Sequence, residues 1–504
     1  MRSENKHPWV VRTIVPEAVY TDRQEFLDYF HKAALNAAGR RTMSTVQLGQ
    51  RRMGKTEIFR RVVNRLFSEQ NPRDPDAVVP VYYSFPDAAR DERSFAKHYL
   101  ENFMRYYVGF LTGQPELVAR TPKEDMLLSE IERARSLYPF SETLDWLLDW
   151  HEGIVKRETY LPQQDALEIP RRISDVDDST IVMFLDEFQN TRLPQHNFEI
   201  VGYMQEAVES PTCPHFVTGS AMSILAREII GRGSLFGRFD SEEIKPMSGY
   251  WGKELALRAG RHYGTEIPED MAPVLVERCG GNPFYITAVV RQAVKLGETL
   301  SDEETLNEIL AVDITSGFIW GELHDQVTRW TERINDQNIT KWILYLSALE
   351  ENEEKDRKKN RLDLERIRRE IRKREGTDVP LETILDVLIR LSRGDLLEFL
   401  ELGDWFRRVK DPILLEFLKV WGRIEVEGHA QGRVRTELMR RYQKRERRIH
   451  EYKGYLAEVH MSQVLLNAQN RILSGNFFNS EEDVPIPWHF TFVRHRYRLG
   501  SGRG

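Results

Sequence analysis

The sequence predicts an α/β protein in which a parallel sheet precedes a series of helices. Residues 42–48 are a β-branched and apolar run that leads, through a glycine-bracketed turn, into a segment with apolar residues at helical spacing. Residues 179–190 contain a continuous apolar run that ends in two carboxylates, as expected of a strand buried on both faces. From residue 250 onward, the apolar residues recur mostly at helical spacing.

The composition is that of a soluble globular protein with several domains. Its 504 residues exceed one ordinary domain and suggest about three. The net charge of -7 gives no overall nucleic-acid signature. Cys213 and Cys279 lack the spacing of a disulfide framework or of a zinc site. Signal-peptide features and apolar runs of about 20 residues are absent from the sequence, which therefore predicts a cytoplasmic protein with no membrane association.

A phosphate-binding loop is the most specific motif of the chain. Residues 49–57 read GQRRMGKTE and match G-x-x-x-x-G-K-T between a strand and a helix. In such a loop, backbone N–H groups and the helix N-terminus face phosphate oxygens. The motif predicts ATP and Mg²⁺ as ligands, with Lys55 on the β- and γ-phosphates and Thr56 on the metal. The predicted nucleotide-binding residues of the loop are Gly49, Gln50, Arg51, Arg52, Met53, Gly54, Lys55, Thr56 and Glu57.

Two carboxylates at the end of the second apolar run complete a predicted hydrolytic site. Ligands of parallel sheets lie beyond the carboxyl ends of the strands, which is where this pair falls. Asp186 is predicted to hold Mg²⁺ through water. Glu187 is predicted to orient and polarise the water that attacks the γ-phosphate.

A third short strand, within residues 214–225, ends in Thr218, Gly219 and Ser220. In additional-strand P-loop ATPases this strand carries a polar residue that touches the γ-phosphate or the attacking water. Ser220 is predicted for this role ahead of Thr218. The alternative is that the Thr-Gly-Ser turn only caps the next helix.

Five segments carry a family resemblance. The chain contains, in this order, GQRRMGKTE, the FLDEFQ strand end, FVTGSAMS, LFGRF and CGGNPFY. In content and order they resemble the archaeal-type ATPases of the STAND group, relatives of AAA+ proteins, over roughly residues 15–420. The family loop is commonly G-x-R-R-x-G-K-T, which Arg51 and Arg52 match. Three roles stay open for these arginines: ion pairs with acidic residues of a lid, contact with a neighbouring protomer, or solvated packing.

The resemblance implies two further residues near the nucleotide. Arg238, in LFGRF, resembles an arginine that stabilises charge in the transition state, and an ordinary strand-edge ion pair is the alternative. Pro283, in GGNP, resembles a glycine-proline element of the lid, and a simple loop between helices is the alternative. The implied fold is a P-loop NTPase parallel sheet with a helical lid, followed by a winged helix-turn-helix and a mainly helical C-terminal segment.

The predicted domains are a P-loop ATPase core at 1–250, a helical lid at 251–335, a winged helix-turn-helix at 336–420, a basic connecting helix at 421–452, and a partial nuclease-like or helical domain at 453–504. The last resembles the start of a restriction-endonuclease-like domain, with Glu458 at its first acidic position. A strand Asp followed by Glu-x-Lys, which such a site needs to hold a metal, does not follow this helix in the sequence, so either the sequence ends within the domain or the domain is incomplete, and nuclease activity is not claimed.

Double-stranded DNA, a protein partner and a second copy of the chain are candidate partners. The predicted recognition helix, residues 381–392, carries Glu382 and Asp386 against Arg390, a poor match to a phosphate backbone. In residues 432–453 the bases greatly outnumber the acids. This segment either tracks DNA phosphates or is an exposed connecting helix.

The predicted function is an ATP-binding and ATP-hydrolysing switch of the STAND/AAA+ type, whose nucleotide state repositions the winged helix. A further hypothesis is that Arg238 is supplied across a subunit interface. The alternatives are a DNA-bound loader or regulator of transposition or defence, and an ATP-gated nuclease effector.

Overall fold

The structure is a computed structural model in which the chain forms two compact units, Met1–Val434 and Arg435–Gly504. The residues that the structure describes are 10–87, 91–119, 124–137, 141–192, 196, 198–219, 233–334, 337–349, 362–400, 405–474 and 482–486. The first unit takes in the predicted core, lid and winged helix. The division of this unit into those domains stays a prediction.

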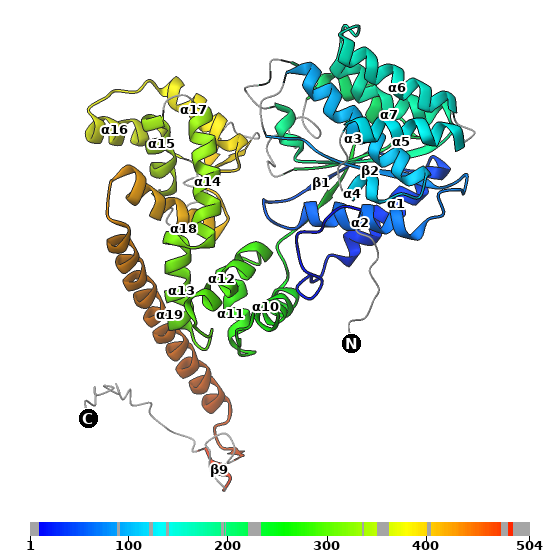
Figure 1. Cartoon of the computed structure of the whole chain (residues 1–504). Coiled ribbons are helices and arrows are strands. Elements are labelled where there is room, and N and C mark those ends of the chain that lie inside the picture. Colours follow the sequence, from blue (N-terminus) through cyan, green and yellow to red (C-terminus); the bar gives the residue numbers. More distant parts are fainter. Residues whose placement is uncertain are drawn as a thin grey trace. The chain divides into compact units, whose positions relative to one another are not determined.

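The N-terminal part of the first unit contains a five-stranded sheet (Figure 1), and its strands are parallel, as the sequence predicts. The strand order is β2-β3-β4-β1-β5, and all four pairings are parallel. β4 lies between β1 and β3, so an extra strand separates the loop strand from the strand that carries the two carboxylates. The strands are β1 (Thr45–Leu48), β2 (Val78–Ser84), β3 (Thr180–Asp186), β4 (His215–Thr218) and β5 (Asp240–Glu243).

Helices cover both faces of this sheet. Tyr82 of β2 contacts Arg60 of α2 (Lys55–Glu69), whereas the next residue, Tyr83, packs on Tyr99 of α3 (Glu92–Leu111) with ring centroids 4.8 Å apart. Because successive side chains of a strand point to opposite faces, α2 and α3 lie on opposite sides of the sheet.

Four phenylalanine rings hold α1 (Gln24–Asn36) and α2 against the sheet. Phe30 and Phe59, from the two helices, meet Phe184 and Phe216, from β3 and β4, with centroid distances of 5.2–5.4 Å around the cluster. All four rings are fully buried. Edge-on ring contacts of this kind add to the free energy of burying the apolar surface, so they fix the helix that follows the phosphate-binding loop.

The segment between β2 and β3 is a helical insertion. Trp146 and Trp150 in it are half-buried and contact each other edge-on at 6.1 Å. Its helices are α4 (Glu116–Ala119), α5 (Glu124–Leu137), α6 (Ser141–Lys156) and α7 (Pro162–Val176), and a short α8 (Gln205–Val208) precedes β4.

Helices follow the sheet in the region predicted as a lid. Asn282 caps α12 by accepting a hydrogen bond from the Phe284 N–H at 3.0 Å, and Pro283 takes the first helical position, where its missing N–H costs nothing. The helices are α10 (Gly249–Tyr263), α11 (Met271–Arg278), α12 (Pro283–Leu296), α13 (Glu303–Ser316) and α14 (Phe318–Arg333).

Residues 337–407, here called the three-helix module, have the element order that a winged helix-turn-helix requires. In the described part of this range, three helices precede two paired antiparallel strands, and Asp411 then caps a helix that begins at Pro412. The winged-helix assignment itself stays a prediction. The elements are α15 (Gln337–Leu349), α16 (Leu364–Glu375), α17 (Leu381–Arg393), β6 (Glu398–Leu400), β7 (Trp405–Arg407) and, after the module, α18 (Pro412–Trp421).

One long helix, α19 (Gln431–Asn467), carries the basic segment and continues through the predicted boundary at residues 452 and 453. Glu458 therefore lies within this helix, not in the first turn of a new one. Two short strands, β8 (Ile472–Leu473) and β9 (Val484–Pro485), pair antiparallel after it. Among the helices in the described ranges, none combines the length and apolar character needed to cross a membrane.

Candidate nucleotide-binding site

The loop between β1 and α2 owes its shape to its two glycines. Gly49 has a φ of 154°, and a Cβ on it would lie 2.2 Å from a methyl carbon of Ile244, so no side chain fits. Gly54 has a φ of 93° immediately before α2, in a region that side chains disfavour. Arg52, between them, also adopts a positive φ of 65°. These conformations turn the loop back over the N-terminus of α2.

Lys55 is buried inside this loop. Its Nζ donates hydrogen bonds to the carbonyl oxygens of Gly49 and Gln50, at 2.6 and 2.7 Å. Burial lowers the pKa of Lys55 to about 8, although the carboxylates of Asp395, Asp186 and Glu187 act in the opposite direction. The ammonium is therefore held by two neutral acceptors, and a phosphate would supply the strong anionic partner that it lacks.

A cavity of about 490 Å³ opens above the loop. Its lining combines loop residues 51–57, the strand-end residues 186, 187 and 219, an N-terminal segment around residues 14–21, and lid residues that include Pro283 and Phe284. A nucleotide needs cationic groups and N–H donors for its phosphates and apolar surface for its base. The lining offers both.

Glu57 holds in place the N-terminal segment that forms part of the cavity wall. Its carboxylate accepts hydrogen bonds from the backbone N–H groups of Ile14 at 2.8 Å and Val15 at 3.4 Å, and it pairs with Arg61 at 2.8 Å. These contacts fix the N-terminal segment beside the loop. Glu57 therefore positions the cavity wall, a role that its place in the motif did not reveal.

The two carboxylates of the β3 end lie at the same cavity. Asp186 is buried, and its Oδ1 and Oδ2 accept hydrogen bonds from the Glu187 N–H and the Tyr82 hydroxyl, each at 2.8 Å. Tyr82 thus orients the carboxylate predicted for the metal. Nothing in the sequence around Tyr82 points to this contact, which depends on the parallel register of β2 and β3.

Glu187 has the properties of a poised proton acceptor. Its φ of 53° is rare for a residue with a side chain, and such strain concentrates at functional sites. Burial and the neighbouring Asp186 charge raise the pKa of Glu187 above its ordinary value, while a hydrogen bond from the Gln189 amide opposes this shift. A raised pKa makes the carboxylate a stronger base near neutral pH.

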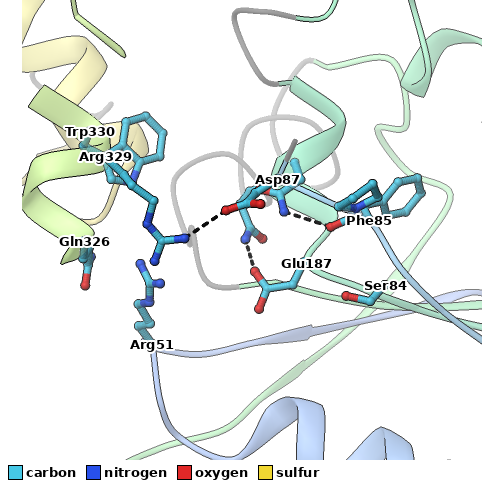
Figure 2. A pocket seen from close by; sticks show the side chains of 11 residues that line it. Arg51, Ser84, Phe85, Asp87, Glu187, Gln326, Arg329 and Trp330 are labelled. Atoms are coloured by element: carbon cyan, nitrogen blue, oxygen red, sulfur yellow. Dashed lines mark hydrogen bonds and ion pairs between the residues drawn. The ribbon is translucent and has the colours of Figure 1, made fainter. Parts of the chain in front are cut away.

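Figure 2 shows a second cavity, which has a volume of about 330 Å³ and shares lining residues with the first. Arg51 and Glu187 line both cavities. The remaining lining comes from residues 84–87 after β2, from Gln189 and Asn190, and from Gln326, Arg329 and Trp330 of α14.

The side chains of the paired loop arginines point in different directions. Arg52 forms an ion pair with Glu322 of α14 at 2.8 Å and lies over the ring of Phe284, 4.9 Å from its centroid. Arg51 faces the second cavity (Figure 2). The first of the roles left open by the sequence, a pair with a lid acid, therefore applies to Arg52. The lid also contacts the loop backbone, because the Asn282 amide donates to the Arg51 carbonyl at 3.3 Å.

Two predicted site residues need separate comment, because only one of them, Arg238, is among the described residues. Arg238 forms an ion pair with Glu209 at 2.7 Å and does not line the nucleotide cavity of its own chain. A role at the nucleotide would need a second chain, and it stays a prediction. Ser220 lies outside the described residues. The alternative, Thr218, is buried and donates its hydroxyl hydrogen to the Gln47 carbonyl at 3.2 Å.

The sequence matches no family model and no curated protein. Among solved structures, the chain is similar to a Walker-type ATPase of Pyrococcus abyssi, with 17% identity and a TM-score of 0.47, over 81% of this chain and 99% of that one. It is also similar to the ORC2 protein of Aeropyrum pernix in its ADPNP-ADP complexes, with 13% identity and a TM-score of 0.44, over 86% and 98%. The ORC1 protein of Aeropyrum pernix in complex with DNA follows, with 14% identity and a TM-score of 0.37, over 84% and 98%. At such values, function has to be argued from the site itself.

The lowered pKa of Lys55 predicts that ATP binding takes up a proton. Above pH 8 the lysine of the free protein is mostly neutral, and the phosphate charge would raise its pKa on binding. Affinity should therefore fall as the pH rises through about 8. Calorimetry at pH 8.5, in buffers of different ionisation enthalpy, measures the proton uptake directly. The matched control is Lys55→Arg, whose guanidinium stays charged and should bind without proton uptake. Equal proton counts for the two proteins would contradict this interpretation.

Proposed function

We propose that this protein binds and hydrolyses ATP and acts as a molecular switch of the STAND/AAA+ type. The observation that carries the proposal is the convergence on one cavity of the loop lysine, Lys55, with the strand-end carboxylates Asp186 and Glu187 and with lid residues. Each of these groups has a defined task in phosphoryl transfer, and such catalysis depends chiefly on positioning and charge.

The metal of the proposed reaction is Mg²⁺, which neutralises phosphate charge when it is bound. Thr56, in the first turn of α2, and Asp186 would hold it. The described residues contain no group of three or more His, Cys, Asp or Glu that could hold a metal ion alone. This suits Mg²⁺, which is usually bound by one or two carboxylates together with water and substrate phosphates. Glu187 would orient the attacking water and accept its proton.

Replacing Glu187 by Gln should lower the steady-state rate about 100-fold or more, because the amide cannot accept the proton. The wild-type rate should fall with decreasing pH, at a higher pH than for an ordinary carboxyl group, since the pKa of Glu187 is raised. Phosphate production across pH 4–8 measures both effects. Lys55→Ala is the companion variant, which should lose ATP binding itself. A Glu187→Gln protein that hydrolyses ATP at the wild-type rate would remove the proposed base.

A chain of contacts supports the switch. Arg52 of the loop pairs with Glu322 of α14, and its Nη2 also lies 3.4 Å from the Gln326 amide oxygen. The Gln326 Nε2 in turn donates to the carbonyl of Gly394, at the end of the α17 helix of the three-helix module, at 3.2 Å. A change at the loop can therefore reach the module through α14. Nucleotide contacts that favour one arrangement of these elements would shift the population toward it.

Asp395 gives this connection an electrostatic component. It follows Gly394, and its charge is the largest influence that opposes the effect of burial on the pKa of Lys55. A carboxylate near the loop repels the phosphates of an incoming nucleotide, so ATP and the present position of the module compete.

Asp395→Asn should bind ATP about fivefold more tightly, because it removes a repulsion of about 1 kcal/mol. Equilibrium titration with a fluorescent ATP analogue gives the ratio of the dissociation constants. The matched control is Asp386→Asn, which removes a carboxylate of α17 that pairs with Arg390. Unchanged or weaker binding by Asp395→Asn would contradict the proposed competition.

A DNA-bound loader or regulator is the second candidate, and the basic face of α19 favours it. The exposed basic side chains there include Arg440, Arg441 and Arg445, whereas α17 offers acids beside Arg390. Contacts between such arginines and phosphates release counterions, so binding should weaken steeply with salt. A second copy or a protein partner, with Arg238 reaching a neighbouring nucleotide, fits either candidate.

Changing Arg440, Arg441 and Arg445 together to Gln should weaken binding to duplex DNA about tenfold or more at low salt, and should flatten its salt dependence. The control triple is Arg366, Arg369 and Arg372 of α16, which are also exposed. Fluorescence anisotropy at several salt concentrations compares the proteins. Loss of binding in the control triple alone would transfer the DNA contact to the three-helix module.

A further inference from the structure

The second cavity has a lining that the hydrolytic site does not explain. Its volume is about 330 Å³. About ten water molecules occupy that volume in liquid water, so the cavity has room for a small hydrated ion. Arg51 and Glu187 form the wall that it shares with the nucleotide cavity. A phosphate ion released next to Glu187 would therefore lie beside this cavity.

Two guanidinium groups converge in this cavity. Figure 2 shows Arg51 and Arg329 pointing toward each other, and each lowers the free energy of nearby anions. Within the described residues, Arg51 has no hydrogen-bonded or ion-paired partner for its side chain. Burial and the neighbouring arginines lower its pKa, so its charge is costly where it is.

Arg329 has carboxylate partners that a stronger anion can displace. Its side chain pairs with Asp87 at 2.9 Å across the cavity and with Asp325 of its own helix at 2.7 Å, and all three side chains are more than a third exposed. Exposed pairs of this kind contribute little free energy. A phosphate oxyanion, with more charge and more acceptor oxygens, competes well for the same guanidinium.

We propose that this cavity is a second anion site, in which Arg51 and Arg329 bind orthophosphate produced from ATP before it leaves the protein. The assignment of the anion rests on the proposed ATPase function. Attack of water on the γ-phosphorus breaks its bond to the β–γ bridging oxygen, which remains on ADP, and the proton goes to Glu187. Because Glu187 lines both cavities, the phosphate formed next to it lies beside the second site.

The test measures orthophosphate binding by calorimetry, with the full-length protein saturated with Mg²⁺ and ADP so that the loop is filled. Wild type should bind phosphate, and Arg329→Gln should bind it at least about tenfold more weakly, since it loses one charge-assisted contact. Asp87→Asn should bind it more tightly, because the competing carboxylate is gone. The matched control, Arg390→Gln, breaks a similar ion pair on α17 and should leave phosphate binding unchanged. A merely structural Asp87–Arg329 pair predicts instead that Asp87→Asn and Arg329→Gln behave alike.

Single-turnover hydrolysis, followed with a fluorescent phosphate-binding protein, adds the kinetic readout. Phosphate release should become faster relative to cleavage in Arg329→Gln. Phosphate binding that is equal in wild type and Arg329→Gln, or weaker in Asp87→Asn, overturns the anion site even if ATP is hydrolysed. Phosphate binding with the expected pattern in a protein that does not hydrolyse ATP keeps the anion site and overturns its link to hydrolysis. The two failures are therefore distinguishable.

Discussion

The buried charge of Lys55 is the constraint on which the site depends. An ammonium group removed from water needs acceptors, and here two loop carbonyls, those of Gly49 and Gln50, supply them. They can do so only because the loop bends back over the helix start, which requires positive φ at Gly49 and Gly54. The conformation of the loop therefore determines both where the Lys55 charge lies and which carbonyl groups accept its hydrogen bonds.

The same bend sends neighbouring side chains in different directions. Arg52 reaches Glu322, and Arg51 faces the second cavity with Arg329. Glu322, Gln326 and Arg329 follow the i, i+4, i+7 spacing of one helix face, so a single face of α14 meets both arginines. One rigid helix therefore contacts the loop at more than one point, and its Gln326 also contacts the three-helix module.

Glu187 connects the chemistry to this arrangement. It directly follows a fully buried strand, lines both cavities and adopts a strained backbone conformation. Its raised pKa follows from burial and from the adjacent Asp186 charge. Protonation of Glu187 removes a negative charge from the wall that the two cavities share, so it changes the electrostatic potential in both cavities.

The sequence by itself determined the parallel sheet, the loop, and the strand-end carboxylates, because these are local patterns: apolar runs, glycine spacing and helical periodicity. The family resemblance suggested Pro283 as well, and in the structure this residue begins α12 and lines the cavity. Only the tertiary structure decided that Arg52 pairs with Glu322, 270 residues away, that Tyr82 holds Asp186, and that Arg238 pairs with Glu209. No short-range pattern encodes such contacts, since they depend on how strands register and how helices pack. The roles that we propose for Arg51 and Asp395 have no local sequence pattern for the same reason, since the charges around Lys55 come from segments that are distant in the chain.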